Sequence, residues 1–227
     1  MPRQCRKNPD RISPFASGDR RRSGRLATRL AGALLIAALL GACSTPAVVM
    51  GAGASGAVAA SQERGLGGSL RDSRIKTVIN YHLLDEDPKL FRSLSTAVYE
   101  GRVLLTGVAP SVAKRDRAVA IAWKADGVKE VINEIIVDAD GVSGSFPRDT
   151  WITTKLRTKL MFDKDVVGIN YSIDTVRGTV HLLGVAQDRD ELKRVLGHAR
   201  HLSYVRNVVN HVILKSDPRR QTNQARN

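Results

Sequence analysis

The chain has 227 residues, a formal net charge of +14 and 4% aromatic residues. This charge would suggest a nucleic-acid partner. Half of it, +7, lies before Cys43, in a segment that has nine Arg or Lys residues and two Asp residues. Further along, the basic excess is small, and the sequence has neither a basic stripe nor an aromatic RNA-binding motif, so we expect no nucleic-acid binding.

Residues 1–42 have the layout of a signal peptide. A basic region that ends in RRRSGRLATR precedes the apolar run LAGALLIAALL, and the small residues Gly41 and Ala42 precede Cys43. The apolar run has about eleven residues, which is too short for the roughly 20 that a membrane-spanning helix needs. The ending LLGAC matches the bacterial lipobox, whose cysteine becomes the lipidated first residue of the mature protein. We therefore predict a lipoprotein signal peptide at 1–42 and lipidation, including palmitate, at Cys43.

The segment after the predicted signal peptide is rich in small residues. Cys5 would leave with the signal peptide, so we expect no disulfide within the mature chain. Ser44 stands where lipoproteins kept at the inner membrane often carry Asp, which favours the outer membrane. Residues 43–71 are dominated by Gly, Ala and Ser without a sustained polar and apolar period, so we predict a flexible tether behind the lipidated cysteine.

Two copies of one sequence pattern follow the tether. A shift of 77 residues superposes 72–137 on 149–214 without a gap, and 17 of the 66 positions are identical. The link between the copies is short, so we expect the two domains to touch. The predicted organisation is a first domain at 72–138, a linker at 139–148, a second domain at 149–215 and a basic disordered tail at 216–227.

Each copy begins with a predicted helix and a β-hairpin. An Asp residue, Asp72 or Asp149, is the expected N-cap of an amphipathic helix. A strand of about eight residues follows the acidic break DEDP or DKDV. A tight turn at 100–101 or 177–178 then leads to the second strand, VLLTGVA or VHLLGVA.

A second helix and a third strand complete each copy. The helix covers about 111–125 or 188–202, and the strand is the Val- and Ile-rich run VKEVINEIIV or VRNVVNHVIL. The order is αββαβ. We predict an α+β fold in which two helices of each domain pack on one face of a three-stranded mixed sheet.

The sequences GRVLLTG and GTVHLLG, each followed by a helix and a V-x-x-V-x-N strand, resemble the BON domain. The resemblance covers nearly the whole chain after the tether, and its occurrence twice behind a lipobox resembles the dual-BON-domain outer-membrane lipoproteins of the DolP (YraP) type. It implies a lipid-anchored protein that faces the periplasm of a Gram-negative bacterium and has no cofactor. It also implies a role in envelope integrity, enrichment at division sites, and binding of anionic phospholipid, such as phosphatidylglycerol, through the second BON domain.

Four glycines recur at equivalent positions of the copies: Gly101, Gly107, Gly178 and Gly184. Their spacing spans a strand, whereas a phosphate-binding loop links a strand to a helix N-terminus. We therefore interpret them as structural glycines that allow turns and close packing.

The chain offers few candidates for catalysis. His198 and His201 lie three residues apart on a predicted helix, a spacing compatible with two metal ligands, but no Cys accompanies them and no H-E-x-x-H pattern is present. We interpret them as ordinary histidines and rank a hydrolase built on the histidines of the second copy well below the alternatives. The sequence thus predicts no metal site and no enzyme.

The first helix of the second copy carries the main functional hypothesis. Its buried stripe is Ile152, Leu156 and Leu160, and a neighbouring stripe places Trp151 among lysines. Because the first copy has Arg74 at the equivalent position, Trp151 is expected to face outward or toward the other domain.

Two interpretations of this surface stay open. The tryptophan either packs against the neighbouring domain or strand, or inserts at the glycerol level of a bilayer while lysines attract lipid phosphate. The resemblance favours the second, and the alternative is a periplasmic interaction scaffold for outer-membrane assembly or peptidoglycan-remodelling proteins. The predicted phospholipid site is Trp151, Thr154, Lys155, Thr158, Lys159 and Phe162.

Overall fold

The computed structural model describes residues 62–140 and 146–220, and all of them belong to one compact unit, Ala54–Asn227. The predicted signal peptide, Cys43 and the predicted tether up to residue 61 lie outside the described residues. Within the described part of the chain, none of the helices is both long enough and apolar enough to span a membrane.

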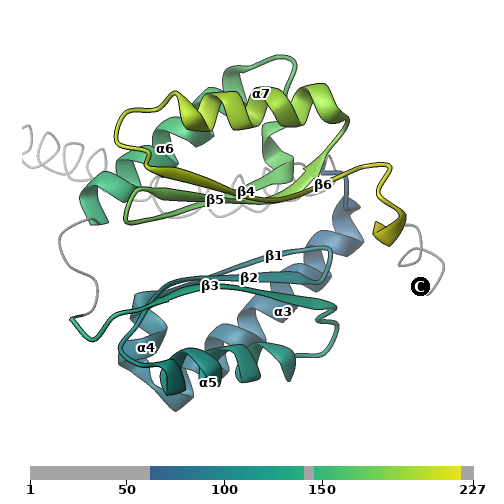
Figure 1. Ribbon diagram of the computed structural model, residues 1–227. Coiled ribbons are helices and arrows are strands. Elements are labelled where there is room, and N and C mark those ends of the chain that lie inside the picture. Colours follow the sequence, from purple (N-terminus) through teal and green to yellow (C-terminus); the bar gives the residue numbers. More distant parts are fainter. Residues whose placement is uncertain (1–61, 141–145, 221–227) are drawn as a thin grey trace, which may run out of the picture. The chain divides into compact units, whose positions relative to one another are not determined.

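Both repeats follow the predicted order, and each adds one short helix (Figure 1). The first repeat contains α3 (Gly65–Glu86), α4 (Pro88–Ser93), β1 (Leu94–Tyr99), β2 (Arg102–Ala109), α5 (Val112–Trp123) and β3 (Glu130–Val137). The second repeat contains α6 (Phe146–Phe162), the 3₁₀ helix η1 (Gly168–Asn170), β4 (Tyr171–Val176), β5 (Thr179–Ala186), α7 (Arg189–Arg200) and β6 (Asn207–Leu214).

Each repeat has a three-stranded mixed sheet. β1 pairs antiparallel with β2, and β2 pairs parallel with β3, so that Val103 lies between Val98 and Val131. The strands β4, β5 and β6 repeat this arrangement. Parallel neighbours need a crossover connection, which α5 and α7 supply. The predicted α+β fold with a mixed sheet in each domain is confirmed.

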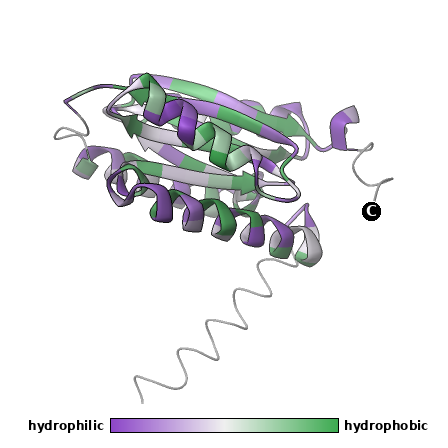
Figure 2. Ribbon diagram, turned by 90° about the horizontal axis from the view of Figure 1, so that it is seen from below, coloured by the Kyte–Doolittle hydropathy of each residue, from purple (hydrophilic) through white to green (hydrophobic). Residues whose placement is uncertain are grey.

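Helices cover one face of each sheet. On α6 the side chains of Ile152, Leu156 and Leu160 recur with the helical period and are at most 1% exposed, and they pack with β4, β5 and α7. The stripe of α3 is equivalent, and it forms the core of the first repeat with α5 and the sheet. Burial of each such side chain contributes about 1.5–3 kcal/mol, so this stripe holds the helix in one rotational setting. Figure 2 shows the alternation of hydrophobic and hydrophilic residues along the helices.

The other faces of the two sheets pack against each other (Figure 1). Seven of the eight residues of β2 and of β5 are buried, which explains why these strands are apolar almost without interruption. The apolar part of this interface is formed by Tyr99, Leu104, Leu183, Val185 and Ile213. The two repeats therefore share a core of their own between the sheets.

Asp72 and Asp149 are not helix N-caps, so this prediction was wrong. α3 begins at Gly65 and α6 begins at Phe146, so both Asp residues lie within the helices and not at their starts. Both carboxylates are buried inside their repeats. Both carboxylates accept hydrogen bonds from the backbone amides of a hairpin turn. An N-cap would instead accept from the first amides of its own helix.

The geometry of the turns explains this role. Asp72 accepts from the backbone N–H groups of Glu100 and Gly101 at 2.8 and 2.9 Å, and Asp149 accepts from those of the equivalent turn at 2.8 Å each. Glu100 and Gly101 both have positive φ, at 53° and 79°, which is the conformation of a type I′ turn. Each Asp therefore satisfies two donors that the turn itself leaves unpaired.

Candidate functional site

The outward face of α6 carries most of the residues of the predicted phospholipid site. Because the apolar stripe of the helix faces the core, Trp151, Lys155, Lys159 and Phe162 face away from it, and all four are exposed. The Trp151 side chain is 40% exposed and that of Phe162 is 86% exposed. The indole therefore faces outward, as the helical period predicts.

These side chains line an open groove between α6 and the loop after α7, which we call the Trp151 groove. Its volume is about 500 Å³. The groove combines apolar surface at both ends of the α6 face with two ammonium groups between them. Its lining residues are Trp151, Lys155, Thr158, Lys159, Phe162, His201, Leu202 and Ser203.

The loop after α7 adds an aromatic residue that sequence reasoning missed. The ring of Tyr204 meets the Trp151 indole edge to face, with centroids 5.6 Å apart and an interplanar angle of 78°. The guanidinium of Arg148 lies over the same tyrosine ring, 5.1 Å from its centroid. Trp151 thus packs on its own repeat, and the tyrosine is itself 61% exposed.

Tyr204 has a left-handed backbone conformation, with φ of +69°. Such a conformation is unfavourable for a residue with a bulky side chain. The first repeat has Gly127 at the equivalent position, with φ of +90°. The alignment of the two repeats could have revealed Tyr204, because a tyrosine in the second repeat corresponds to a glycine in the first.

Thr154 does not join the other predicted site residues. Its side chain lines a different depression, of about 320 Å³, together with Arg157 and residues of both repeats. Thr158 lines the Trp151 groove, and its hydroxyl donates to the Thr154 carbonyl at 2.9 Å. The structure therefore brings together five of the six predicted residues.

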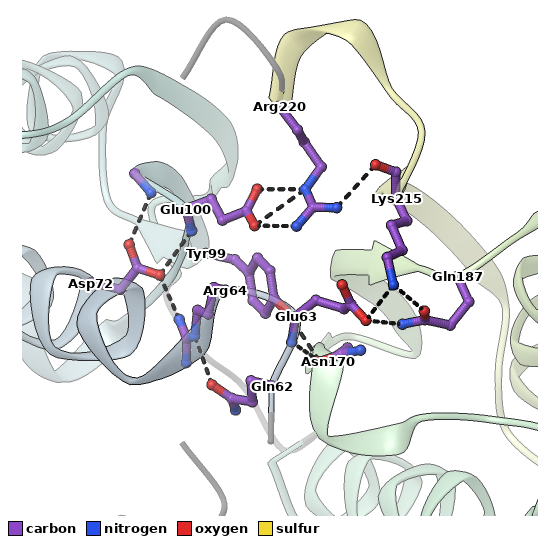
Figure 3. A network of polar contacts seen from close by, with 11 residues as sticks. Gln62, Glu63, Arg64, Asp72, Tyr99, Glu100, Asn170, Gln187, Lys215 and Arg220 are labelled. Carbon is purple, nitrogen blue, oxygen red and sulfur yellow. Dashed lines mark hydrogen bonds and ion pairs between the residues drawn. The ribbon is translucent and has the colours of Figure 1, made fainter. Parts of the chain in front are cut away.

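A separate polar network surrounds the start of the described chain (Figure 3). Gln62 Nε2 donates to the Ile169 carbonyl at 3.0 Å. The Glu63 amide donates to Asn170 Oδ1, also at 3.0 Å (Figure 3). In the first repeat, Arg64 Nη1 donates to Asp72 at 2.6 Å. The predicted tether therefore extends too far, because residues from 62 onward contact both repeats and the helix begins before residue 71.

The predicted disordered tail also begins too early. Arg220 is 6% exposed and forms a bidentate ion pair with Glu100, at 2.7 and 2.9 Å, while its Nη1 donates to the Lys215 carbonyl at 3.0 Å (Figure 3). The hydrogen bonds to Glu100 raise the pKa of the Arg220 guanidinium. The chain from 216 to 220 is thus ordered by a buried cation that requires an acidic partner.

Glu63 connects this network to the second repeat. Its carboxylate accepts from Gln187 Nε2 at 2.7 Å and from Lys215 Nζ at 3.2 Å. Burial raises the pKa of the Glu63 carboxyl, but the two hydrogen bonds together with the positive charges of Lys215 and Arg220 outweigh burial, so that the pKa lies below its ordinary value.

A groove of about 380 Å³ lies beside the network and is lined by charges of both signs, including the paired Arg64 and Asp72 and the paired Arg220 and Glu100. Its lining also includes Arg71, Arg74 and Lys129, but its four carboxylates, Glu63, Asp72, Glu100 and Asp126, offset the positive charge and repel an anion. This groove is therefore the weaker candidate for binding an anion.

His198 and His201 do not converge on one site. His198 Nε2 lies 2.6 Å from Asp163 Oδ2, and this hydrogen bond lowers the pKa of the Asp163 carboxyl. His201 Nδ1 lies 2.7 Å from the Gly197 carbonyl oxygen, within its own helix. The two rings have separate partners, as expected for ordinary histidines.

Two of the glycines lie where neighbouring backbone approaches closely. A Cβ added to Gly107 would lie 2.2 Å from the Ser93 carbonyl oxygen, and one added to Gly184 would lie 2.0 Å from that of Asn170. Side chains at these positions would push apart the segments that lead into β1 and β4.

The pattern of these repeats matches one family model, the BON domain, at residues 71–139 and 148–216. The chain belongs to the BON family. Each match begins within the first helix of a repeat and ends two residues after its third strand.

Several curated proteins are similar to this BON chain over most of their lengths. An uncharacterized protein from the gshII 5′ region of Anaplasma centrale is 39% identical over 63% of this chain and 95% of its own. The outer membrane lipoprotein DolP of Haemophilus influenzae is 31% identical over 67% of this chain and 79% of its own. A 21 kDa hemolysin of Actinobacillus pleuropneumoniae is 30% identical over 66% of this chain and 78% of its own.

Proposed function

We propose that this BON protein is a non-catalytic outer-membrane lipoprotein that docks on anionic phospholipid through the Trp151 groove and supports the integrity of the envelope, including at division sites. The observation that carries the proposal is the exposed combination of Trp151, Lys155, Lys159 and Phe162 on one face of α6. The similarity to a protein named as an outer membrane lipoprotein supports the location.

The chemistry of the groove fits the interface between lipid head groups and acyl chains. Tryptophan and tyrosine prefer this depth, because an apolar ring and a polar N–H or O–H group lie on one side chain. Phe162, exposed on the same face, adds apolar surface that water solvates poorly. Lys155 and Lys159 lie between the two apolar ends, where their ammonium groups can meet lipid phosphate.

The binding energy of the groove alone is modest. Each lysine near an anionic surface contributes on the order of 1 kcal/mol, so two lysines and one or two aromatic rings give affinities near the millimolar range. The predicted lipid anchor at Cys43 compensates for this. Only 18 residues separate Cys43 from Gln62, and a chain of that length reaches at most about 60 Å. The anchor would therefore keep the groove at a high local concentration near the bilayer.

The anchor itself has a direct test. Cells that produce the full chain are labelled with radioactive palmitate and fractionated. We expect label on the wild-type protein in the outer-membrane fraction and no label on the Cys43→Ser variant. Equal labelling of the two proteins would show that Cys43 is not the acylated residue.

The groove is tested with a chain that begins at Ala54 and thus lacks the anchor. Its co-sedimentation with phosphatidylglycerol vesicles is compared with that of the Trp151→Glu variant, which places a negative charge at the centre of the contact. We expect at least about a tenfold loss of binding, because the change removes an interfacial aromatic ring and adds charge repulsion.

Trp123→Glu is the matched control. Trp123 ends α5 in the first repeat and is 52% exposed, so the chemical change is the same but the surface is different. Circular dichroism establishes that both variants fold. Equal binding of the two variants would contradict the proposal and would favour a protein-interaction scaffold, with an outer-membrane assembly or peptidoglycan-remodelling protein as partner.

A further inference from the structure

The interface between the two sheets contains a buried histidine whose environment does not satisfy it. His181, on β5, is 3% exposed, and neither of its ring nitrogens has a hydrogen-bond partner among the described residues. A buried polar group without a partner costs about 1–3 kcal/mol, so such groups usually mark a ligand or a functional role.

Two further ligand-type side chains lie next to it. Glu134 on β3 and His211 on β6 each offer one atom, and the three ligand atoms of this cluster all lie within 4.8 Å of one another. The Glu134 carboxylate is 2.9 Å from His211 Nε2 and 4.0 Å from His181 Nδ1. In a tetrahedral zinc site, neighbouring ligand atoms are about 3.3 Å apart, so rotations that move the atoms by roughly 1 Å would complete the geometry.

The strand register explains why these residues meet. His181 points from β5 into the same interface as Leu183 and Val185, which follow it at the strand period of two. Glu134 and His211 occupy equivalent positions of the third strands in the two repeats. Packing the sheets face to face therefore brings both third-strand residues to the same buried side chain.

We propose that Glu134, His181 and His211 form a binding site for a divalent transition-metal ion, Zn²⁺ in the first instance, that joins the two BON domains. Two imidazoles and one carboxylate are a donor set that zinc accepts, with water as the fourth ligand. The Glu134 and His211 side chains are 30% and 19% exposed, so one side of the site is open to that water.

The state of the histidine suits this role. Burial lowers the pKa of His181, which keeps the imidazole neutral with a free lone pair. The metal would link β3 of the first repeat to β5 and β6 of the second, and it would thereby oppose separation of the domains.

The test uses the full chain, purified without a histidine tag and with Cys5→Ser and Cys43→Ser, so that thiols do not bind the metal. Zn²⁺ affinity is measured by competition with a chromophoric chelator. We expect one ion per chain with a dissociation constant in the micromolar range or below. We also expect a rise in melting temperature with Zn²⁺ and none with Mg²⁺, which prefers oxygen ligands.

The repeat supplies the variants. His181→Leu introduces the residue that the first repeat carries at the equivalent position, Leu104, so the interface remains packed. Glu134→Gln keeps the shape of the side chain and removes its charge. Each change should weaken Zn²⁺ binding at least about tenfold, because it removes one of three ligands. His198→Leu, on the surface of α7, should leave the affinity unchanged.

Two results would overturn the site. One is Zn²⁺ affinity in His181→Leu and Glu134→Gln that equals that of the parent chain. The other is an equal loss of affinity in His198→Leu, which would place the ion elsewhere. Nitrogen NMR of labelled histidine rings supplies a second measurement, because Zn²⁺ should shift the ring signals of His181 and His211 and leave that of His198 in place.

Discussion

The two BON repeats have one fold but carry different surfaces on the first helix. On α3 the equivalent stripe is Arg74, Val78, His82 and Asp85, in which Val78 is half-buried against the core and the other three are exposed. On α6 the equivalent residues are Trp151, Lys155, Lys159 and Phe162. The inward stripes, by contrast, are apolar in both copies and are almost fully buried.

The same contrast extends to the loop after the second helix. Gly127 of the first repeat corresponds to Tyr204 of the second, and both have positive φ. The second repeat therefore keeps a strained backbone position and places an aromatic ring there, beside Trp151. The core residues therefore preserve the same fold in both copies, while the face of the first helix that is turned away from the core differs between them.

Asp72 and Asp149 have the same role in both repeats, and replacing them should cause the greatest loss of stability. Replacing Asp149 with Ala leaves two amide groups of the hairpin turn without their acceptor and should cost about 3–5 kcal/mol of unfolding free energy. Asp72→Ala should cost more, because Arg64, whose side chain is 14% exposed, also loses its ionic partner. Urea unfolding of the two variants measures the difference.

The control for these variants is Asp116→Ala. Asp116 is an exposed residue of α5 that pairs with its neighbour Arg115, so its removal should change the unfolding free energy by less than about 0.5 kcal/mol. If Asp149→Ala were as mild as this control, the carboxylates would not be needed by the turns.

A double variant can give the Trp151 groove the residues that the first repeat carries at the equivalent positions. The double variant Lys155→Val and Lys159→His carries the residues of the first repeat. It should bind phosphatidylglycerol vesicles roughly 30-fold more weakly at low salt, because each lysine contributes on the order of 1 kcal/mol. The difference should shrink at high salt, where charges are screened. Vesicle co-sedimentation at two ionic strengths measures both.

The matched control changes the same residue types in the first repeat. Lys76→Val and Lys89→His remove two exposed lysines and the same charge, but from α3 and α4. Binding that falls equally in both double variants would mean that only net charge matters, and the position of the groove would lose its significance.

A change at Tyr204 should have the smallest effect, and it affects stability and vesicle binding for different reasons. Tyr204→Gly places in the second repeat the residue of the first. It should change the unfolding free energy by less than about 1 kcal/mol, because the relief of strain at positive φ offsets the loss of the ring contacts with Trp151 and Arg148. It should also weaken vesicle binding a few-fold, because Trp151 loses its ring contact. Thermal melts and co-sedimentation of one preparation give both values, and a destabilisation of more than about 2 kcal/mol would contradict the strain argument, because the ring contacts would then be lost without any gain.

Much of the fold followed from local sequence patterns. The helical period of Ile152, Leu156 and Leu160 predicted which face of α6 is buried, and the same period set the outward direction of Trp151. The N-cap assignment of Asp72 and Asp149 failed because an Asp before an apolar period looks the same whether it starts a helix or lies within one. Their true donors are 28 and 29 residues away in sequence, so no local pattern reveals them.

The candidate site was predictable only in part. The stripe on α6 lies within one helix, so its spacing can be read directly. Tyr204 lies 53 residues after Trp151, and only the packing of the loop against α6 brings the rings together. Thr154 lies on the same helix as the other predicted site residues, but it lines a different depression.

The duplication, the αββαβ order and the inward face of each helix follow from the amino-acid sequence, because they depend on repeat spacing and on periods of two and 3.6 residues. The folded chain was needed to show how the two sheets meet, how Gln62–Arg64 and Arg220 hold the repeats together, and which histidines converge. Glu134, His181 and His211 come from three strands of two domains. Their proximity depends on strand register and sheet packing, which are long-range properties that no short segment encodes.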